Sequence, residues 1–282
     1  MNSIKKGSIV YRKSQSKDVI FTVEKIIKKP NDKVAVLKGL IERVLTYSPL
    51  DDLEIVDKKF AYEKFSKLDR KINERINNFY NLKNGVDFKK NYENKRFQET
   101  LITGKILHLD GDKKYSQKSY NYYKKMGLNS VVKNIPEFRQ PKLVYNLLKL
   151  YKPDILIITG HDEMISKNRN YNDLNNYRNS RYFINSVIEA RKYDNESHSN
   201  LVIFAGACQS YFEGLIMAGA NFASSPARIL IDFLDPLIIA EKIATTEKYK
   251  YISIDDIEQE LRDGKRGIDG IGASGKMYRL LE

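Results

Sequence analysis

Residues 201–214, with the sequence LVIFAGACQSYFEG, place the chain's single cysteine at the end of a continuous apolar run. Such a run of Val, Ile and Phe followed by small residues is typical of a buried strand that ends in a loop. A second run, DILIITGHD at 154–162, ends in the same way and carries His161. Cys208 and His161 are therefore predicted at the carboxyl ends of two strands, where ligands and reacting groups collect in open α/β sheets.

From residue 101 onward, strand-like and helix-like segments alternate. The strand KILHLDGD (105–112) precedes the helical pattern SQKSYNYYKKMG, and VVKNIPE precedes PKLVYNLLKLYKP. Strands separated by helical crossovers form a parallel sheet covered on both faces. We therefore predict a three-layer, parallel-sheet α/β domain over 101–282, with residues 110, 161 and 208 at one rim. A last helix is predicted at IDDIEQELRDG (254–264), followed by a flexible or tightly turned glycine-dense tail, 264–276.

The first hundred residues have a different organisation. Short β-branched segments such as DVIFTVEKII and KVAVLKG, separated by polar pieces, predict a small SH3-like β-barrel over 1–57. Apolar residues then recur every three or four positions from Phe60 to Tyr80, which predicts an amphipathic helix ending near Gly85. We interpret 58–100 as a basic helical connector.

The formal net charge of +13 is unevenly distributed along the chain. Residues 1–150 carry 33 Lys and Arg against 17 Asp and Glu, whereas residues 151–282 carry 16 against 19. A basic front half suits an acidic partner. RNA is the less favoured partner, because aromatic residues at helical spacing are more often packing groups than stacking platforms for bases.

Several classes of protein are disfavoured by composition. No run approaches the roughly 18 apolar residues of a membrane span, and the N-terminus lacks the apolar core of a signal peptide. One cysteine cannot form an intramolecular disulfide, and His108, His161 and His198 lack metal-ligand spacing. We expect no metal, no cofactor, no membrane association and a reducing compartment.

A cysteine nucleophile requires its thiolate, which a histidine or a helix N-terminus stabilises near neutral pH. His161 and a helix predicted to begin near Tyr211 supply both. The alternative is that Cys208 is a small buried hydrophobe. Hydrolase-type elbows place the nucleophile before the histidine, so they do not fit this chain order. The chain order matches the caspase-like layout, in which a strand ending in His is followed, about 50 residues later, by a strand ending in Ala-Cys.

The sequence also resembles the YabG family of sporulation-specific peptidases of spore-forming Firmicutes. The resemblance rests on ILHLDGD (106–112), PDILIITGHD (153–162), NSRYFINSVIEAR (179–191), the long block 201–229 and GIDGIG (267–272). It implies a cysteine peptidase that cleaves spore coat and related spore-assembly proteins at basic residues. It further implies that His161 and Cys208 are the catalytic pair, and that the enzyme acts in the cytoplasm of the sporulating cell, associated with the forming spore coat.

Cleavage beside a basic residue requires a carboxylate in the specificity pocket. Asp110 and Asp112, at the end of the first α/β strand, are the candidates, with acidic turn residues as the alternative; Asp232 and Asp235 are weaker ones. Asp162 stands where caspase-like peptidases usually have a glycine that helps form the oxyanion hole, so it either contacts substrate or orients a loop. The Cys208 N-H is a candidate oxyanion donor.

A second function class remains open from the sequence alone. In it, the chain is a noncatalytic binding or scaffold protein whose basic front half docks on an acidic partner or RNA. The sequence leaves the oligomeric state undecided.

Overall fold

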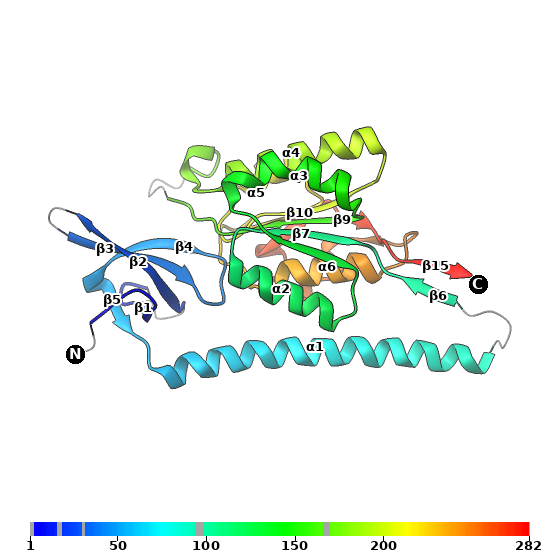
Figure 1. Ribbon diagram of the computed structural model, residues 1–282, viewed down its shortest axis with the longest axis horizontal. Coiled ribbons are helices and arrows are strands. Elements are labelled where there is room, and N and C mark those ends of the chain that lie inside the picture. Colours follow the sequence, from blue (N-terminus) through cyan, green and yellow to red (C-terminus); the bar gives the residue numbers. More distant parts are fainter. Residues whose placement is uncertain (1–2, 16–18, 30–31, 94–98, 166–169, 282) are drawn as a thin grey trace.

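The computed structural model describes residues 3–281 apart from 16–18, 30–31, 94–98 and 166–169. Two principal sheets lie side by side, and a long helix, α1, runs beneath the second of them (Figure 1).

The first of these, which we call the N-terminal sheet, has five antiparallel strands in the order β4-β3-β2-β1-β5. Their bounds are Ile9–Arg12 (β1), Phe21–Lys29 (β2), Asp32–Gly39 (β3), Leu45–Pro49 (β4) and Leu53–Ile55 (β5). The expected small β module is thus present. The SH3-like closure of this sheet stays a prediction.

Helix α1 extends over Lys58–Glu93 and includes Gly85, so the predicted end near Gly85 is wrong. A glycine inside a helix costs only about 1 kcal/mol relative to alanine, which a long helix tolerates. Leu68 and Ile76 on α1 are buried in the core below the second sheet. Part of the predicted connector, residues 94–98, lies outside the described residues.

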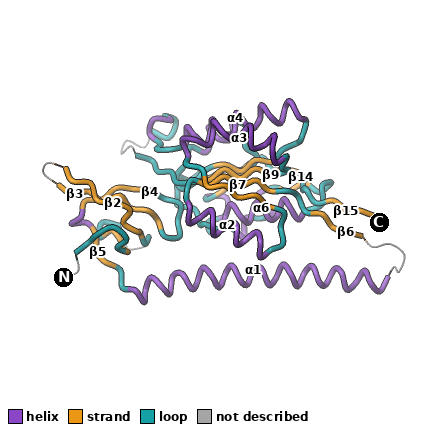
Figure 2. Tube along the Cα trace, in the orientation of Figure 1, coloured by secondary structure: helices purple, strands orange, loops and turns teal. Residues whose placement is uncertain are grey.

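The second sheet has the order β13-β11-β10-β9-β7-β8 (Figure 2). Strands β7, β8, β9, β10 and β11 are mutually parallel, as expected, but β13 pairs antiparallel with β11, which corrects the prediction of an all-parallel sheet. The strand bounds are Ile106–Asp110 (β7), Ser130–Asn134 (β8), Ile155–Thr159 (β9), Val202–Ala205 (β10), Phe222–Ser224 (β11) and Ile268–Gly270 (β13).

Helices cover both faces of this sheet, which confirms the predicted three layers (Figure 1). α3, α4 and α5 pack with one face, while α2, α6 and α1 pack with the other. Their bounds are Lys113–Lys125 (α2), Gln140–Tyr151 (α3), Ser180–Ser197 (α4), Phe212–Met217 (α5) and Asp235–Thr245 (α6). Short strands pair outside the main sheet: Glu99–Ile102 (β6) with Tyr278–Leu281 (β15), and Tyr251–Ile252 (β12) with Ala273–Ser274 (β14).

The C-terminal segment departs from two predictions. Residues 254–264 form two 3-10 turns, Ile254–Asp256 and Glu258–Glu260, instead of a helix. Ser253 and Asp256 cap the first turn reciprocally, and Leu261 then becomes extended. The glycine-dense tail supplies strands β13 and β14. At Gly270 a Cβ atom would lie 2.1 Å from the Asn221 carbonyl oxygen, so only glycine fits this strand pairing.

Further 3-10 turns lie at Leu50–Asp52, Glu137–Arg139, Leu174–Asn176 and Gly264–Arg266. Among the helices that the structure describes, none is both long and apolar enough to span a bilayer.

Arg75 is the principal polar link between α1 and the second sheet's helices. Its Nε donates to Glu241 on α6 at 2.6 Å and to the Tyr122 hydroxyl on α2 at 3.0 Å, and its Nη1 donates to Glu260 at 2.6 Å. Glu241 is 8% exposed. The cost of removing the Glu241 carboxylate from water is therefore offset by its ion pair with Arg75.

Replacing Arg75 by Met should lower the free energy of unfolding by about 2 kcal/mol, because Glu241 would keep a largely buried, unpaired charge. Urea unfolding measures the change. The matched control is Arg70→Met, since Arg70 is an exposed arginine of the same helix. Equal losses in the two variants would show that the Arg75 network adds nothing specific.

Candidate active site

The rim at the carboxyl ends of the parallel strands collects the residues singled out from the sequence. Asp110 ends β7, and the registers place it opposite Thr159, the last residue of β9. His161 follows β9 by two residues, and Cys208 follows β10 by three. Because β7, β9 and β10 are neighbours in the sheet, the predicted common rim is confirmed.

The strand order reverses at this rim. From β7 the chain moves outward to β8 and then returns to the other side of β7 with β9 and β10. Such a switch point leaves a crevice outside the strand ends, and open α/β sheets bind their ligands there. Asp110 ends β7 and His161 follows β9, the two strands that meet at this switch point.

His161 is buried between two carboxylates. Its Nε2 atom lies 3.6 Å from Asp112 Oδ2, and its Nδ1 lies 3.7 Å from Glu137 Oε1. The His161 backbone N-H also donates to Glu137 Oε1 at 2.8 Å. The Tyr115 ring packs against the imidazole with 5.6 Å between ring centroids. Each ring nitrogen of His161 therefore faces a carboxylate, although neither contact is short enough for a hydrogen bond.

Glu137 was not anticipated from the sequence. It follows β8 at the same rim and accepts the His161 N-H because its carboxylate fits against two glycines. A Cβ atom on Gly111 would lie 2.2 Å from Glu137 Oε1, and one on Gly160 would lie 2.4 Å from it. The signal that the sequence offered was an acidic residue just beyond a strand, with glycines following the two neighbouring strands.

Cys208 is completely buried, as in the alternative interpretation of this residue as a small buried hydrophobe. Its Sγ accepts the Ile231 N-H at 3.3 Å and contacts the Ile231 carbonyl oxygen at 3.8 Å. Burial raises the pKa of the thiol to about 12, so the predicted stabilisation of a thiolate is not met in this conformation. The helix after it, α5, has only six residues and begins at Phe212, four positions beyond the sulfur.

The sulfur bonds to Ile231 and not to the His161 ring. Tyr115 packs its ring against His161, and its hydroxyl donates to the carbonyl oxygens of Gly39 and Glu42. Cys208 and His161 thus share one rim without forming a direct hydrogen bond.

Asp110 and Asp112 are both paired with basic residues of the N-terminal sheet. Asp110 Oδ2 lies 2.5 Å from Arg43 Nη1, and Asp112 Oδ2 lies 2.5 Å from Lys38 Nζ. Burial alone would raise the pKa of each carboxyl, but Arg43 lowers that of Asp110, and His161 with Lys38 lowers that of Asp112, below the ordinary value. Both carboxylates are therefore ionised and bind cations. Asp112 also caps α2 through the Lys114 and Tyr115 N-H groups.

Asp162 connects the loops that follow β9 and β10. Its carboxylate accepts hydrogen bonds from the hydroxyls of Ser180 and Ser210 and from the Asn179 N-H, and it is completely buried. Burial is the main cause that raises its pKa, to about 6. These contacts fit the orientation of a loop, which was one of the two roles considered for Asp162.

Comparison with known proteins identifies the family of this chain. The chain matches the family described as YabG peptidase U57 over residues 5–281. It is 36% identical to the sporulation-specific protease YabG of Bacillus subtilis (strain 168) over 280 residues, which cover 95% of this chain and 94% of that protein. The chain belongs to the YabG peptidase family. No solved structure matches it.

In this member of the YabG family, a groove of about 680 Å³ opens beside the rim, between the N-terminal sheet and the second sheet. The loop after β10 contributes Gln209 to it, and the loop after β9 contributes Glu163 and Met164. Val44 and Thr46 form part of the opposite wall. The groove is therefore bounded on one side by the loops that follow β9 and β10 and on the other by the N-terminal sheet.

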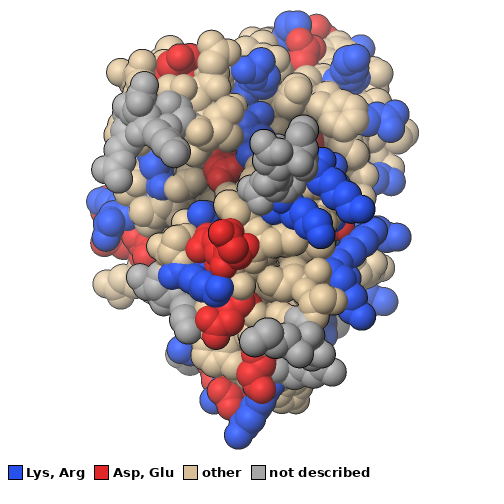
Figure 3. All heavy atoms as spheres, turned by 90° about the vertical axis from the view of Figure 1, so that its left-hand side faces the viewer, with Lys and Arg blue, Asp and Glu red and all other residues tan. Residues whose placement is uncertain are grey.

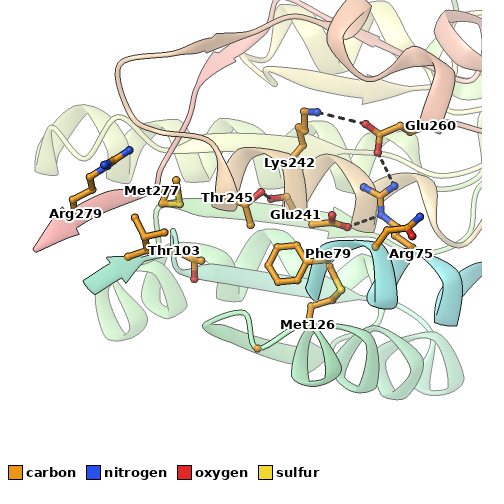
Figure 4. Close-up of a pocket in the computed structure, with 13 residues that line it drawn as sticks. Arg75, Phe79, Thr103, Met126, Glu241, Lys242, Thr245, Glu260, Met277 and Arg279 are labelled. Atoms are coloured by element: carbon orange, nitrogen blue, oxygen red, sulfur yellow. Dashed lines mark hydrogen bonds and ion pairs between the residues drawn. The ribbon is translucent and has the colours of Figure 1, made fainter. Parts of the chain in front are cut away.

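A second cavity, of about 560 Å³, lies between α1, α6 and the β6-β15 pair (Figure 4). Phe79, Met126 and Met277 form its apolar wall, and the Arg75, Glu241 and Glu260 network borders it. None of the residues predicted from the sequence for catalysis or substrate binding lines it. Among the described residues, no group of His, Cys, Asp and Glu is arranged to hold a metal ion.

Charged side chains are mixed on the face that the N-terminal sheet presents to solvent. Lys and Arg gather on one flank of this view, while Asp and Glu side chains occupy its middle (Figure 3). The basic composition of the front half thus does not produce a uniformly basic surface on this face.

Replacing Asp162 by Asn should change how stability depends on pH. The native pKa of about 6 exceeds the ordinary value of 3.8, so this carboxyl stabilises the fold below about pH 4 and loses that contribution as the pH rises through 6. Relative to wild type, the variant should therefore gain about 3 kcal/mol of unfolding free energy between about pH 4 and pH 7.

Urea unfolding at a series of pH values measures this difference, with Asp173→Asn as the control for loss of a loop carboxylate. Parallel stability profiles for Asp162→Asn and wild type would contradict the assigned shift.

Proposed function

We propose that the chain is a cysteine endopeptidase of sporulation, with Cys208 as nucleophile and His161 as general base. Its substrates are spore coat and related spore-assembly proteins, cleaved at basic residues in the cytoplasm of the sporulating cell. Membership of the YabG peptidase family supports peptide hydrolysis, and the Bacillus subtilis relative carries the name of a sporulation-specific protease.

The observation that carries the proposal is the position of His161, which lies one strand away from the only cysteine and between two carboxylates. In the reaction, His161 takes the thiol proton, and the thiolate attacks the substrate carbonyl carbon. Asp112 and Glu137 stabilise the resulting imidazolium. The imidazolium then protonates the leaving amine, and a water molecule, deprotonated by His161, hydrolyses the thioester and regenerates the thiol.

The tetrahedral intermediates require hydrogen-bond donors. The Cys208 N-H has no acceptor among the described residues, so it is available as one oxyanion donor. The turn that presents it is distinctive, because Gly206 and Gln209 have φ angles of +117° and +56°. A Cβ atom on Gly206 would lie 2.6 Å from Ser224 Oγ, so glycine is required there.

The noncatalytic alternative receives less support. A noncatalytic protein would not need His161 to lie between Asp112 and Glu137. Membership of a peptidase family also favours catalysis over scaffolding. The distinguishing result of the noncatalytic alternative would be tight, salt-dependent binding of an acidic partner by a protein that cleaves nothing.

Cys208→Ala should abolish cleavage of spore coat proteins, and His161→Ala should lower kcat by about a thousandfold, because the thiol then has no base. Electrophoresis of a coat-protein digest, with a pair of peptides that differ only by Arg or Leu before the cleaved bond, measures activity and preference.

His198→Ala is the matched control, since His198 is an exposed histidine at the end of α4. Undiminished cleavage by the Cys208→Ala protein would refute the proposed function, and equal rates on the two peptides would refute the basic preference.

A further inference from the structure

Arg43 lies in the turn between β3 and β4 of the N-terminal sheet, yet its side chain is completely buried in the rim of the other sheet. Its Nη1 donates to Asp110 Oδ2 at 2.5 Å. The guanidinium carbon lies 4.9 Å from the centre of the Tyr115 ring and 5.4 Å from that of Phe233. The pocket thus has a carboxylate at its base and aromatic walls, which is an arrangement that binds a guanidinium group.

This burial is costly for a purely structural contact. Arg43 Nε and Nη2 are buried without hydrogen-bond partners among the described residues. Removing ions from water costs several kcal/mol each, and well-packed apolar side chains often stabilise a core as well or better. A pocket that retains a carboxylate for a guanidinium side chain is therefore more consistent with a binding function than with stability alone.

The location of the pocket supports a binding function. Asp110 Oδ2 also accepts the Thr159 hydroxyl at 2.9 Å, so the guanidinium is bound where the ends of β7 and β9 meet at the switch point. Tyr115, which forms one wall of the pocket, also packs its ring against the His161 ring. The pocket is thus adjacent to the candidate general base.

The backbone next to Arg43 is bound like an added strand. Val44 forms a parallel bridge with Asp162, the residue that directly follows His161. Thr46 then contacts Glu163 through its hydroxyl at 2.5 Å. Extended peptides commonly bind to proteins by such backbone pairing, with side-chain pockets supplying specificity. The segment 43–46 therefore occupies the path that a substrate strand would take beside His161.

The same segment helps to cover the nucleophile. Val44 packs in one apolar cluster with Cys208 and Ile231, together with Val10, Phe21 and Leu53 of the N-terminal sheet. Lys38 pairs with Asp112, the carboxylate nearest His161 Nε2. In this arrangement the N-terminal sheet engages both candidate specificity carboxylates and excludes solvent from the sulfur.

We infer that the pocket formed by Asp110, Tyr115 and Phe233 receives the basic side chain of a substrate, and that Arg43 occupies it in the intact chain as an internal competitor. This inference rests on the proposed function. Substrate enters only when the segment 39–46 leaves the rim, and departure of this segment also exposes Cys208. Tyr115 and Phe233 thereby become specificity residues in addition to Asp110.

Arg43→Met tests the inference with two readouts, the rate at which iodoacetamide alkylates Cys208 and the hydrolysis of matched arginyl and leucyl peptides. Because apparent affinity scales with the fraction of open molecules, we expect alkylation at least about tenfold faster and KM for the arginyl peptide about tenfold lower than in wild type. Intact mass before and after each assay identifies the alkylated residue and verifies that the chain is whole.

The control is Arg12→Met, which removes an arginine-carboxylate pair, Arg12 with Asp52, from within the N-terminal sheet. It should match wild type in both readouts. The double variant Arg43→Met, Asp110→Asn should keep the fast alkylation and lose the preference for arginine. If Arg43→Met does not fold, as judged by circular dichroism, Lys38→Met replaces it, since loss of the Lys38-Asp112 pair loosens the same interface without unpairing Asp110.

Two results would overturn the inference. Wild-type rates of alkylation and arginyl hydrolysis in Arg43→Met and Lys38→Met would show that the segment does not compete with substrate, while leaving the peptidase function in place. Fast alkylation without cleavage of either peptide by any variant would instead refute the proposed function and, with it, the assignment of the pocket.

Discussion

The ion pair between Arg43 and Asp110 is the constraint on which the relation between the two sheets depends. Both side chains are completely buried, so neither can remain charged there without the other. Forming the pair brings the β3-β4 turn to the switch point of the second sheet. The apolar contacts of Val44 with Cys208 and Ile231 are made by the same turn. One charged contact thus positions the N-terminal sheet over the part of the molecule that carries the candidate chemistry.

The electrostatic arrangement of the rim is consistent with that position. Asp112 and Glu137 lie on the two sides of His161, Asp110 lies at the same rim, and carboxylates at such density require cations. In this conformation Arg43 and Lys38 supply them. In the proposed reaction, the basic side chain of a substrate and the protonated imidazole would supply them in their place. The high thiol pKa belongs to the covered state, since burial is its main cause.

Much of the second sheet was predictable from the sequence because each buried strand is a short apolar run followed by a polar or small residue. This pattern located β7, β9 and β10 and therefore put Asp110, His161 and Cys208 at one rim. The antiparallel pairing of β13 was not predictable from the sequence, since a high density of glycine near Gly270 indicates a loop. In the structure, Gly270 lies in a strand because the Asn221 carbonyl oxygen leaves no room for a side chain. Helix α1 continues past Gly85 because a long helix tolerates the small cost of one interior glycine, which the helix propensity of the local sequence does not show.

The insertion of Arg43 could not be read from the sequence either. Residues 39–44, GLIERV, mix aliphatic and charged side chains, and no local pattern shows that a residue will pair with a carboxylate 67 positions later. For the same reason the sequence could not decide between a nucleophile and a buried hydrophobe at Cys208, because the residues that cover the sulfur lie near the start of the chain. Glu137 was overlooked because its partner is the backbone of His161, and backbone donors leave no trace in the side-chain pattern.

In the proposed mechanism, residues 39–46 and the basic side chain of a substrate compete for the same pocket. Hydrogen-deuterium exchange of the Cys208→Ala protein, with and without a saturating arginyl peptide, measures this competition. We expect the peptide to increase amide exchange in 39–46 while protecting the residues after His161. Unchanged protection of 39–46 with the peptide bound would rule out the competition, because the segment and the peptide would then occupy the protein together.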